Sequence, residues 1–137
     1  MKIILTFALV LSVLTTVCSA TSFQQQNKYE VAGIDDAASA DKFFLDLKKA
    51  VEKDERDKVV LMVDYPINVL IKGRRTRLRS KVELLKNYDI VFNKNVKQAL
   101  AKASAPSMVN SQGVMIGDGE IWFNLINDKL KITAINN

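Results

Sequence analysis

The sequence predicts an α+β domain in which a curved antiparallel sheet packs on helices from the N-terminal and middle parts of the chain. Two observations support this fold class. Apolar residues recur at helical spacing in several stretches before residue 105, and from Gly113 onward they alternate with polar residues, as in half-buried strands. Helices and strands that are segregated along the chain are typical of the α+β class.

Residues 1–20 have the features of a cleavable secretory signal peptide. Met1-Lys2 is a short positive region, Ile3 to Val17 is a mostly apolar run, and Cys18-Ser19-Ala20 offers small residues to a peptidase. We expect cleavage after Ala20, so that the mature protein is periplasmic or secreted.

Two other interpretations of this segment are open to test. A membrane anchor is disfavoured because the apolar run is shorter than the roughly 20 residues that a helix needs to cross a bilayer. We therefore expect no transmembrane span in the mature form. Lipidation of Cys18 is the second alternative, although Val17 stands where lipoprotein signals have a small residue.

The chain after the signal predicts one domain. Residues 21–36 are polar and without periodicity, so we expect a flexible leader in which Tyr29 and Val31 dock on the domain. Residues 37–137 have the length of a single domain with one modest core. Loss of Cys18 with the signal would leave no disulfide to stabilise it.

The composition restricts the chemistry. The chain has no histidine, which is the usual general base near neutral pH and a common metal ligand. Without a mature cysteine, zinc and iron–sulfur sites also lose their preferred ligands. We therefore expect no metal, no cofactor and no catalytic residue. The formal net charge of +5, to which Lys2 contributes, is compatible with an acidic partner but too small to indicate nucleic acid.

Three helices are predicted from capping residues and periodicity. The first begins at a Ser39 cap, the second has the capping-box spacing of Ser80 and Glu83 and runs to about Phe92, and the third is capped by Asn95. The stretch from 55 to 65 is apolar enough for either a strand or a short helix, and Pro66 ends it in both cases.

The strands are predicted as a hairpin and a meander. Ile67–Ile71 and Thr76–Arg79 flank a turn at Lys72-Gly73-Arg74, and three C-terminal strands cover 113–116, 120–126 and 129–135. In the middle strand of the meander, Ile121 and Phe123 point to one face and Trp122 to the other.

Three segments resemble blocks in small bacterial envelope proteins of the nuclear transport factor 2-like superfamily: 57–66 (DKVVLMVDYP), 88–92 (YDIVF) and 112–123 (QGVMIGDGEIWF). The resemblance covers about 35–136. It implies a cone of curved sheet packed on helices, and it implies a helix over 56–64.

The superfamily includes cyclase-like enzymes, dehydratases, ligand-binding domains, assembly domains and immunity proteins against secreted toxins, so the resemblance implies fold more than function. Its acid–base enzymes commonly pair an aspartate with a histidine in the cone. The absence of histidine therefore argues against the enzymatic branch.

Arg74, Arg75, Arg77 and Arg79 are the first candidate site. On a strand, Arg75, Arg77 and Arg79 share one face, and a row of guanidinium groups suits carboxylates or phosphates. The alternative is a solvated face that keeps an edge strand from pairing with other chains.

A pocket in the mouth of the cone is the second candidate, with the lining residues Tyr65, Tyr88, Phe92, Trp122, Asp64 and Asp89. The alternatives are that the aromatic residues form core and that the two acids cap helix ends rather than act as bases. The turn at 118–120 (DGE) is typical of a hairpin rather than of a calcium site.

Together these patterns predict a non-enzymatic exported binding domain. The specific hypothesis is an immunity or inhibitor protein against an envelope-acting toxin or hydrolase. A carrier of a small apolar ligand is the alternative, and an isomerase, dehydratase or cyclase-like enzyme that works without histidine is a more distant one. A homodimer stays open.

Overall fold

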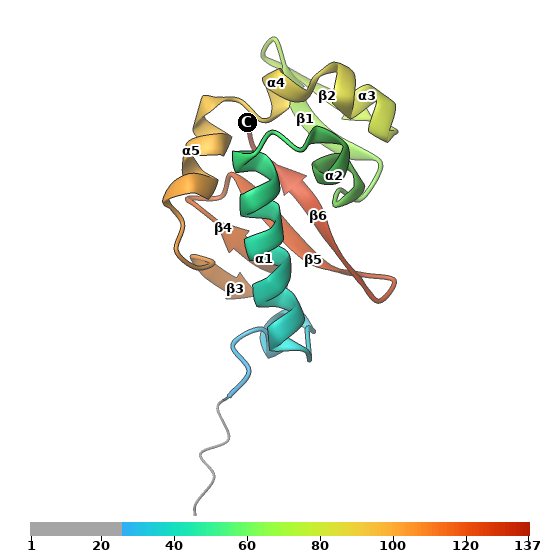
Figure 1. Cartoon of the computed structure of the whole chain (residues 1–137). Helices are drawn as coiled ribbons and strands as arrows, with labels where there is room; N and C mark the ends of the chain where they lie inside the picture. Colours follow the sequence, from blue (N-terminus) through green and yellow to red (C-terminus); the bar gives the residue numbers. More distant parts are fainter. Residues whose placement is uncertain (1–25) are drawn as a thin grey trace, which may run out of the picture.

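The computed structural model describes residues 26–137 (Figure 1). The expected signal peptide, its cleavage site and residues 21–25 of the expected leader lie outside the described residues. The described chain is α+β, as predicted, with five α-helices and antiparallel sheets that do not close into a barrel. Within residues 26–137, no helix combines the length and the apolar character needed to cross a membrane.

Helix α1 (Ala37–Glu52) lies across one face of the larger sheet (Figure 1). Its N-cap is Asp36, whose side-chain Oδ1 accepts a hydrogen bond from the Ser39 amide at 3.1 Å. The predicted Ser39 cap is therefore wrong, because the helix already includes Ser39 and the carboxylate before it satisfies the free amide. The buried face of α1 consists of Ala40, Phe44, Leu47, Ala50 and Val51.

The residues just before α1 pack on the domain. A 3₁₀ turn, η1 (Glu30–Ala32), is held by the Asn27 side chain, which donates to the backbone oxygen of Ile34 at 2.7 Å. Tyr29 is fully buried and its hydroxyl donates to Asp41, whereas Val31 is 59% exposed. From Asn27 onward, the stretch expected to be a flexible leader is thus part of the packed structure.

The ambiguous stretch forms helix α2 (Arg56–Leu61), with Val59 and Val60 buried. Helix α3 (Lys81–Lys86) has the expected Ser80 cap, because the Glu83 amide donates to Ser80 Oγ at 3.3 Å. The Glu83 carboxylate accepts from the Arg79 amide at 2.8 Å, one residue before the position that a capping box would use.

The second predicted helix does not run unbroken to Phe92. It is interrupted at Asn87, and a short helix α4 (Tyr88–Val91) follows. Helix α5 (Lys94–Lys102) is capped by Asn93, whose Oδ1 accepts from the Val96 amide at 3.1 Å. The predicted Asn95 cap is wrong, since that residue already lies inside the first turn.

The strands form two sheets. β1 (Ile67–Ile71) and β2 (Arg74–Leu78) make a hairpin whose turn residues Lys72 and Gly73 both have positive φ, 51° and 73°. This combination is typical of the tight two-residue turns that join antiparallel strands.

The larger sheet contains β3 (Met108–Asn110), β4 (Gly113–Ile116), β5 (Ile121–Ile126) and β6 (Lys129–Ile135) in that order, all antiparallel. The sequence did not predict β3, because three residues are too few to show an alternation.

The core lies between α1 and the larger sheet. Ile121 and Phe123 of β5 are fully buried, and the ring of Phe123 lies 5.0 Å from that of Phe43 on α1. Val63, just after α2, makes a parallel bridge to Ile132 of β6. The C-terminal end of α1 lies next to α2 and α5, close to the largest charged cluster of the described chain (Figure 1).

Candidate functional site

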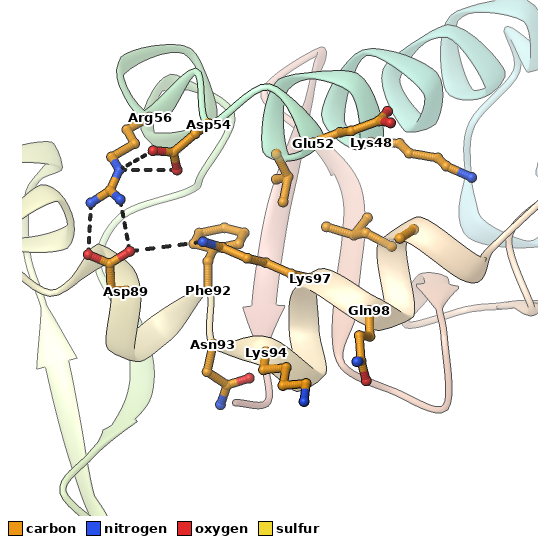
Figure 2. Close-up of a pocket in the computed structure, with 13 residues that line it drawn as sticks. Lys48, Glu52, Asp54, Arg56, Asp89, Phe92, Asn93, Lys94, Lys97 and Gln98 are labelled. Carbon is orange, nitrogen blue, oxygen red and sulfur yellow. Dashed lines mark hydrogen bonds and ion pairs between the residues drawn. The ribbon is translucent and has the colours of Figure 1, made fainter.

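A cleft of about 590 Å³ opens between the end of α1 and α5 (Figure 2). Its floor is apolar and includes Val51, Phe92 and Leu100, all buried. Its rim is charged, with Lys48, Glu52, Asp54, Arg56, Asp89, Lys94 and Lys97. We call this feature the α1–α5 cleft.

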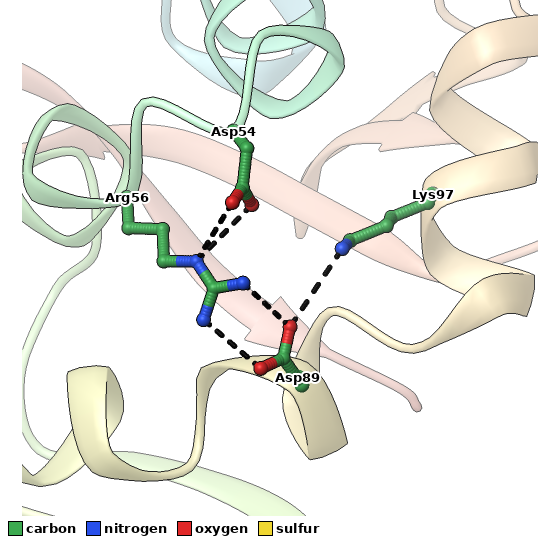
Figure 3. A network of polar contacts seen from close by, with 4 residues as sticks. All are labelled: Asp54, Arg56, Asp89 and Lys97. Atoms are coloured by element: carbon green, nitrogen blue, oxygen red, sulfur yellow. Dashed lines mark hydrogen bonds and ion pairs between the residues drawn. The ribbon is translucent and has the colours of Figure 1, made fainter.

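The rim charges are largely paired with each other (Figure 3). Arg56 donates through Nη1 and Nη2 to both carboxylate oxygens of Asp89 at 2.9 and 2.8 Å, and through Nε to Asp54 at 3.0 Å. Lys97 Nζ lies 3.9 Å from Asp89. This network links the start of α2 to α4 and to α5, and it leaves no strong excess of either sign.

A stacked aromatic pair lies beside this network. The rings of Tyr88 and Phe92 are 4.8 Å apart and inclined by 20°, and the Arg56 guanidinium lies 4.8 Å from the Tyr88 ring centre. Tyr88 is 1% exposed, and its hydroxyl has no hydrogen-bond partner within the described part of the chain. Burial raises the pKa of Tyr88 to about 12.

This arrangement is poorly suited to acid–base catalysis. The hydrogen bonds from Arg56 lower the pKa of Asp89, so its carboxylate stays ionised and occupied by guanidinium donors. The Tyr88 hydroxyl is neutral near pH 7 and shielded from solvent. A general base must instead have a free lone pair within reach of a substrate proton.

The structure does not bring the predicted pocket residues together around one cavity. Phe92 and Asp89 line the α1–α5 cleft, while Tyr88 packs behind it. Tyr65 donates its hydroxyl to the Val60 carbonyl at 2.9 Å and so closes the end of α2. Asp64 is half-buried, and its backbone amide donates to Ile132 at 2.9 Å.

Trp122 lies on the face of β5 opposite to the core. It alternates with the buried Ile121 and Phe123 and is itself only half-buried. In register across the sheet, its neighbours are Met115 of β4 and Ala134 of β6. Phe123, not Trp122, therefore faces the helices, and the proposed grouping of Trp122 with Tyr88 and Phe92 is not found.

The arginines of the first candidate site lie on β2 and just after it. Arg75 and Arg77 alternate with the half-buried Thr76 and the buried Leu78, so both point outward. Arg79 follows the end of the strand and is also exposed. We call Arg75, Arg77 and Arg79 the arginine face. Arg74 is exposed beside the turn, in register with Ile71.

The side chains of these arginines carry uncompensated charge. Among residues 26–137, none of Arg74, Arg75, Arg77 and Arg79 lies within 4.0 Å of a carboxylate oxygen. The remaining arginine of the chain, Arg56, is held by two aspartates. Leu70 of β1, which is in register with Arg75, is 43% exposed and adds an apolar group to the same face.

Sequence reasoning missed Arg56 and Lys97 as members of the cleft. Both occur in charge-rich stretches where a solvated position is the ordinary expectation, and only packing brings them to Asp89. The helical spacing of Val96 and Leu100 is typical of a buried helix face, and both are buried on α5, with Lys97 on the rim of the cleft.

The described residues contain no group of three or more acidic, histidine or cysteine side chains arranged to hold a metal ion. In the turn at 118–120, Glu120 Oε2 accepts a hydrogen bond from the Asp118 amide at 2.6 Å.

Comparison of the chain with protein-family models, with curated proteins and with solved structures gives no match.

Proposed function

We propose that this chain is a non-enzymatic binding domain that recognises an acidic protein through its arginine face. The observation that carries the proposal is the absence of any carboxylate partner for Arg75, Arg77 and Arg79 within the described residues, although the same domain pairs Arg56 twice. A planar guanidinium group binds a carboxylate through two parallel hydrogen bonds, which gives geometric specificity as well as charge attraction.

The specific version of the proposal is an immunity or inhibitor protein that acts against an envelope-acting toxin or hydrolase. It rests on the expected signal peptide at 1–20 and on the resemblance to envelope proteins of the nuclear transport factor 2-like superfamily. Such a function requires no cofactor and no catalytic residue.

A carrier of a small apolar ligand has weaker support. The aromatic residues expected to line its pocket are separated, with Tyr88 and Phe92 stacked in the interior and Trp122 on the opposite face of β5. The α1–α5 cleft offers an apolar floor, but its rim is charged, and Asp54, Arg56, Asp89 and Lys97 on that rim are paired with each other.

The proposal is tested by reversing the arginine face with Arg75→Glu, Arg77→Glu and Arg79→Glu together. Exposed substitutions away from caps and core usually change stability by within about 0.5 kcal/mol each, which applies to Arg75 and Arg77. Arg79 precedes the Ser80 cap of α3, but its contact to Glu83 is made by the backbone amide, which the substitution retains, so the variant should fold. Because a charge-assisted contact contributes roughly 1.5 to 3 kcal/mol, partner binding should fall by orders of magnitude. Quantitative mass spectrometry of proteins captured from the native envelope measures that loss.

The matched control reverses three exposed lysines elsewhere, Lys53, Lys102 and Lys129, which form no ion pair among the described residues. It changes the net charge by the same amount, and the captured protein should be retained. Trp122→Ala should also retain it. Equal capture by the folded arginine variant and the wild type would contradict the proposal, and loss with Trp122→Ala alone would favour a function of the outer sheet face.

A further inference from the structure

We infer that the partner binds as an extended segment added to the free edge of β2, with acidic residues at every second position. This inference rests on the proposed function and names the partner's conformation and charge pattern. Three features of the hairpin support it: a free backbone edge, the phase of its hydrogen bonds, and the side chains that share this edge.

The edge is free because β2 pairs with β1 alone in a two-stranded sheet. A strand at a sheet edge presents backbone N–H and C=O groups that another chain can use. Charged side chains such as these arginines can keep an edge strand from pairing with other chains. Strand β2 has neither a proline nor a bulge, which are two further features that prevent an edge strand from pairing.

The phase of the hairpin hydrogen bonds follows from its turn. Ile71 and Arg74 flank the two-residue turn and form the closing hydrogen-bonded pair, so the next pair, Leu70 and Arg75, directs its backbone groups away from each other. The contacts of Leu70 agree with this phase. Its amide donates to the Asn137 side chain at 2.9 Å, and its carbonyl accepts from the same side chain at 2.7 Å, both outside the hairpin.

By the same alternation, the backbone groups of Arg75 and Arg77 point to the outer edge of β2. Outside the β1–β2 ladder, these groups make no hydrogen bond to any residue from 26 to 137. The C-terminal Asn137 thus covers the edge of β1, while the corresponding edge of β2 is open.

The free backbone groups and the free side chains belong to the same two residues. An added antiparallel strand would therefore form hydrogen-bonded pairs with Arg75 and Arg77, and the side chains of the paired residues would lie about 5 Å away on the arginine face. Carboxylates at alternate positions of that strand would meet the guanidinium groups of Arg75 and Arg77, and Arg79 is a further exposed charge just beyond the end of the strand. Main-chain hydrogen bonds provide affinity and alternate side chains provide specificity in this mode of recognition.

The experiment uses a fluorescein-labelled peptide of alternating glutamate and threonine and follows its anisotropy as the protein of residues 21–137 is added. Two isomers of the peptide carry backbone N-methyl groups, one on the glutamates and the other on the threonines. Their charge and composition are equal, but in an extended strand alternate amides face opposite edges. For an antiparallel addition, the glutamate-methylated isomer should bind at least about tenfold more weakly than the other isomer, since it cannot donate to β2.

Each outcome separates the inference from the proposed function. Selective loss with the threonine-methylated isomer would support strand addition in the parallel orientation. Equal binding of both isomers, abolished by reversal of the arginine face, would overturn strand addition and retain charge recognition. Equal binding that survives the reversal would contradict both. The protein could instead bind phosphatidylglycerol vesicles but not the peptide, and lose vesicle binding when the arginine face is reversed. That result would overturn the inference in favour of a membrane surface.

Discussion

At the scale of single residues, two tyrosines with similarly raised pKa values have different consequences for stability. Burial raises the pKa of both Tyr65 and Tyr88 to about 12. The Tyr65 hydroxyl donates to the Val60 carbonyl at 2.9 Å, whereas the Tyr88 hydroxyl has no partner in the described part of the chain. The cost of removing a hydroxyl from water is therefore offset at Tyr65 and not at Tyr88.

We predict that Tyr88→Phe stabilises the protein and that Tyr65→Phe destabilises it. An unsatisfied buried polar group costs about 1 to 3 kcal/mol, and a typical hydrogen bond contributes about 1 kcal/mol. The midpoint of urea unfolding should thus rise for the first variant and fall for the second, with an unchanged slope. A lower midpoint for Tyr88→Phe would show that its hydroxyl is hydrogen-bonded in solution.

At the scale of secondary-structure elements, α1, α3 and α5 each begin at a residue whose side chain satisfies a free backbone amide, whereas α2 and α4 have no such cap. Asp36 caps α1 through the Ser39 amide, and Asn93 caps α5 through the Val96 amide. Hydrogen bonds from Ser39 lower the pKa of Asp36, as expected for a carboxylate that accepts from both a hydroxyl and an amide.

We predict that Asp36→Ala destabilises the protein by about 1 kcal/mol, the usual cost of losing an N-cap. Ser39→Ala is the matched control. Ser39 lies inside the helix and contributes only a hydrogen bond to the cap, so the loss should be clearly smaller. Chemical unfolding of both variants measures the difference. A larger loss of stability for Ser39→Ala than for Asp36→Ala would instead indicate that Ser39 is the N-cap, as the sequence predicted.

At the scale of the whole molecule, the ionisable groups predict how stability depends on pH. The pKa values of Asp41 and Asp89 are lowered, the first mainly by the Tyr29 hydroxyl and the second mainly by Arg56. A carboxyl with a lowered folded-state pKa stabilises the fold above its ordinary value of about 3.9 and loses that effect as the pH falls further. The raised tyrosine pKa values have the opposite sign, so their contribution is complete below about pH 10 and falls above it.

We therefore predict a broad plateau of melting temperature between about pH 5 and pH 9, with a decline on either side. The chain has no histidine, so no side chain of that type titrates within the plateau. Scanning calorimetry over this range provides the measurement. Asp41→Asn should reduce the acid decline, and a transition near pH 6 to 7 would be incompatible with the charge arrangement described above.

The sequence by itself determined the local features of this protein. The helical spacing of Ala40, Phe44, Leu47, Ala50 and Val51 indicates the buried side of α1, because the signal depends on residues close together in the chain. The hairpin turn was predicted at Lys72-Gly73-Arg74 with a strand over Thr76–Arg79, whereas Arg74 already pairs with Ile71 and β2 ends at Leu78. Alternation likewise assigned Arg75 and Arg77 to one outward face. The Ser80 cap of α3 was predicted correctly, but those of α1 and α5 were misplaced by a few residues. At α1, Asp36 and Ser39 are both favoured capping types and only the backbone conformation distinguishes them.

Only the tertiary structure decided which distant residues meet. Arg56 reaches Asp89 because α2 and α4 pack near each other, and Trp122 is kept from Tyr88 and Phe92 because the pleat of β5 turns it away from the core. The availability of the β2 edge is also a tertiary property. Asn137 covers the β1 edge at Leu70, while nothing in residues 26–137 covers Arg75 and Arg77. Local sequence patterns specify which way a side chain points, but packing across the whole chain determines what it meets there.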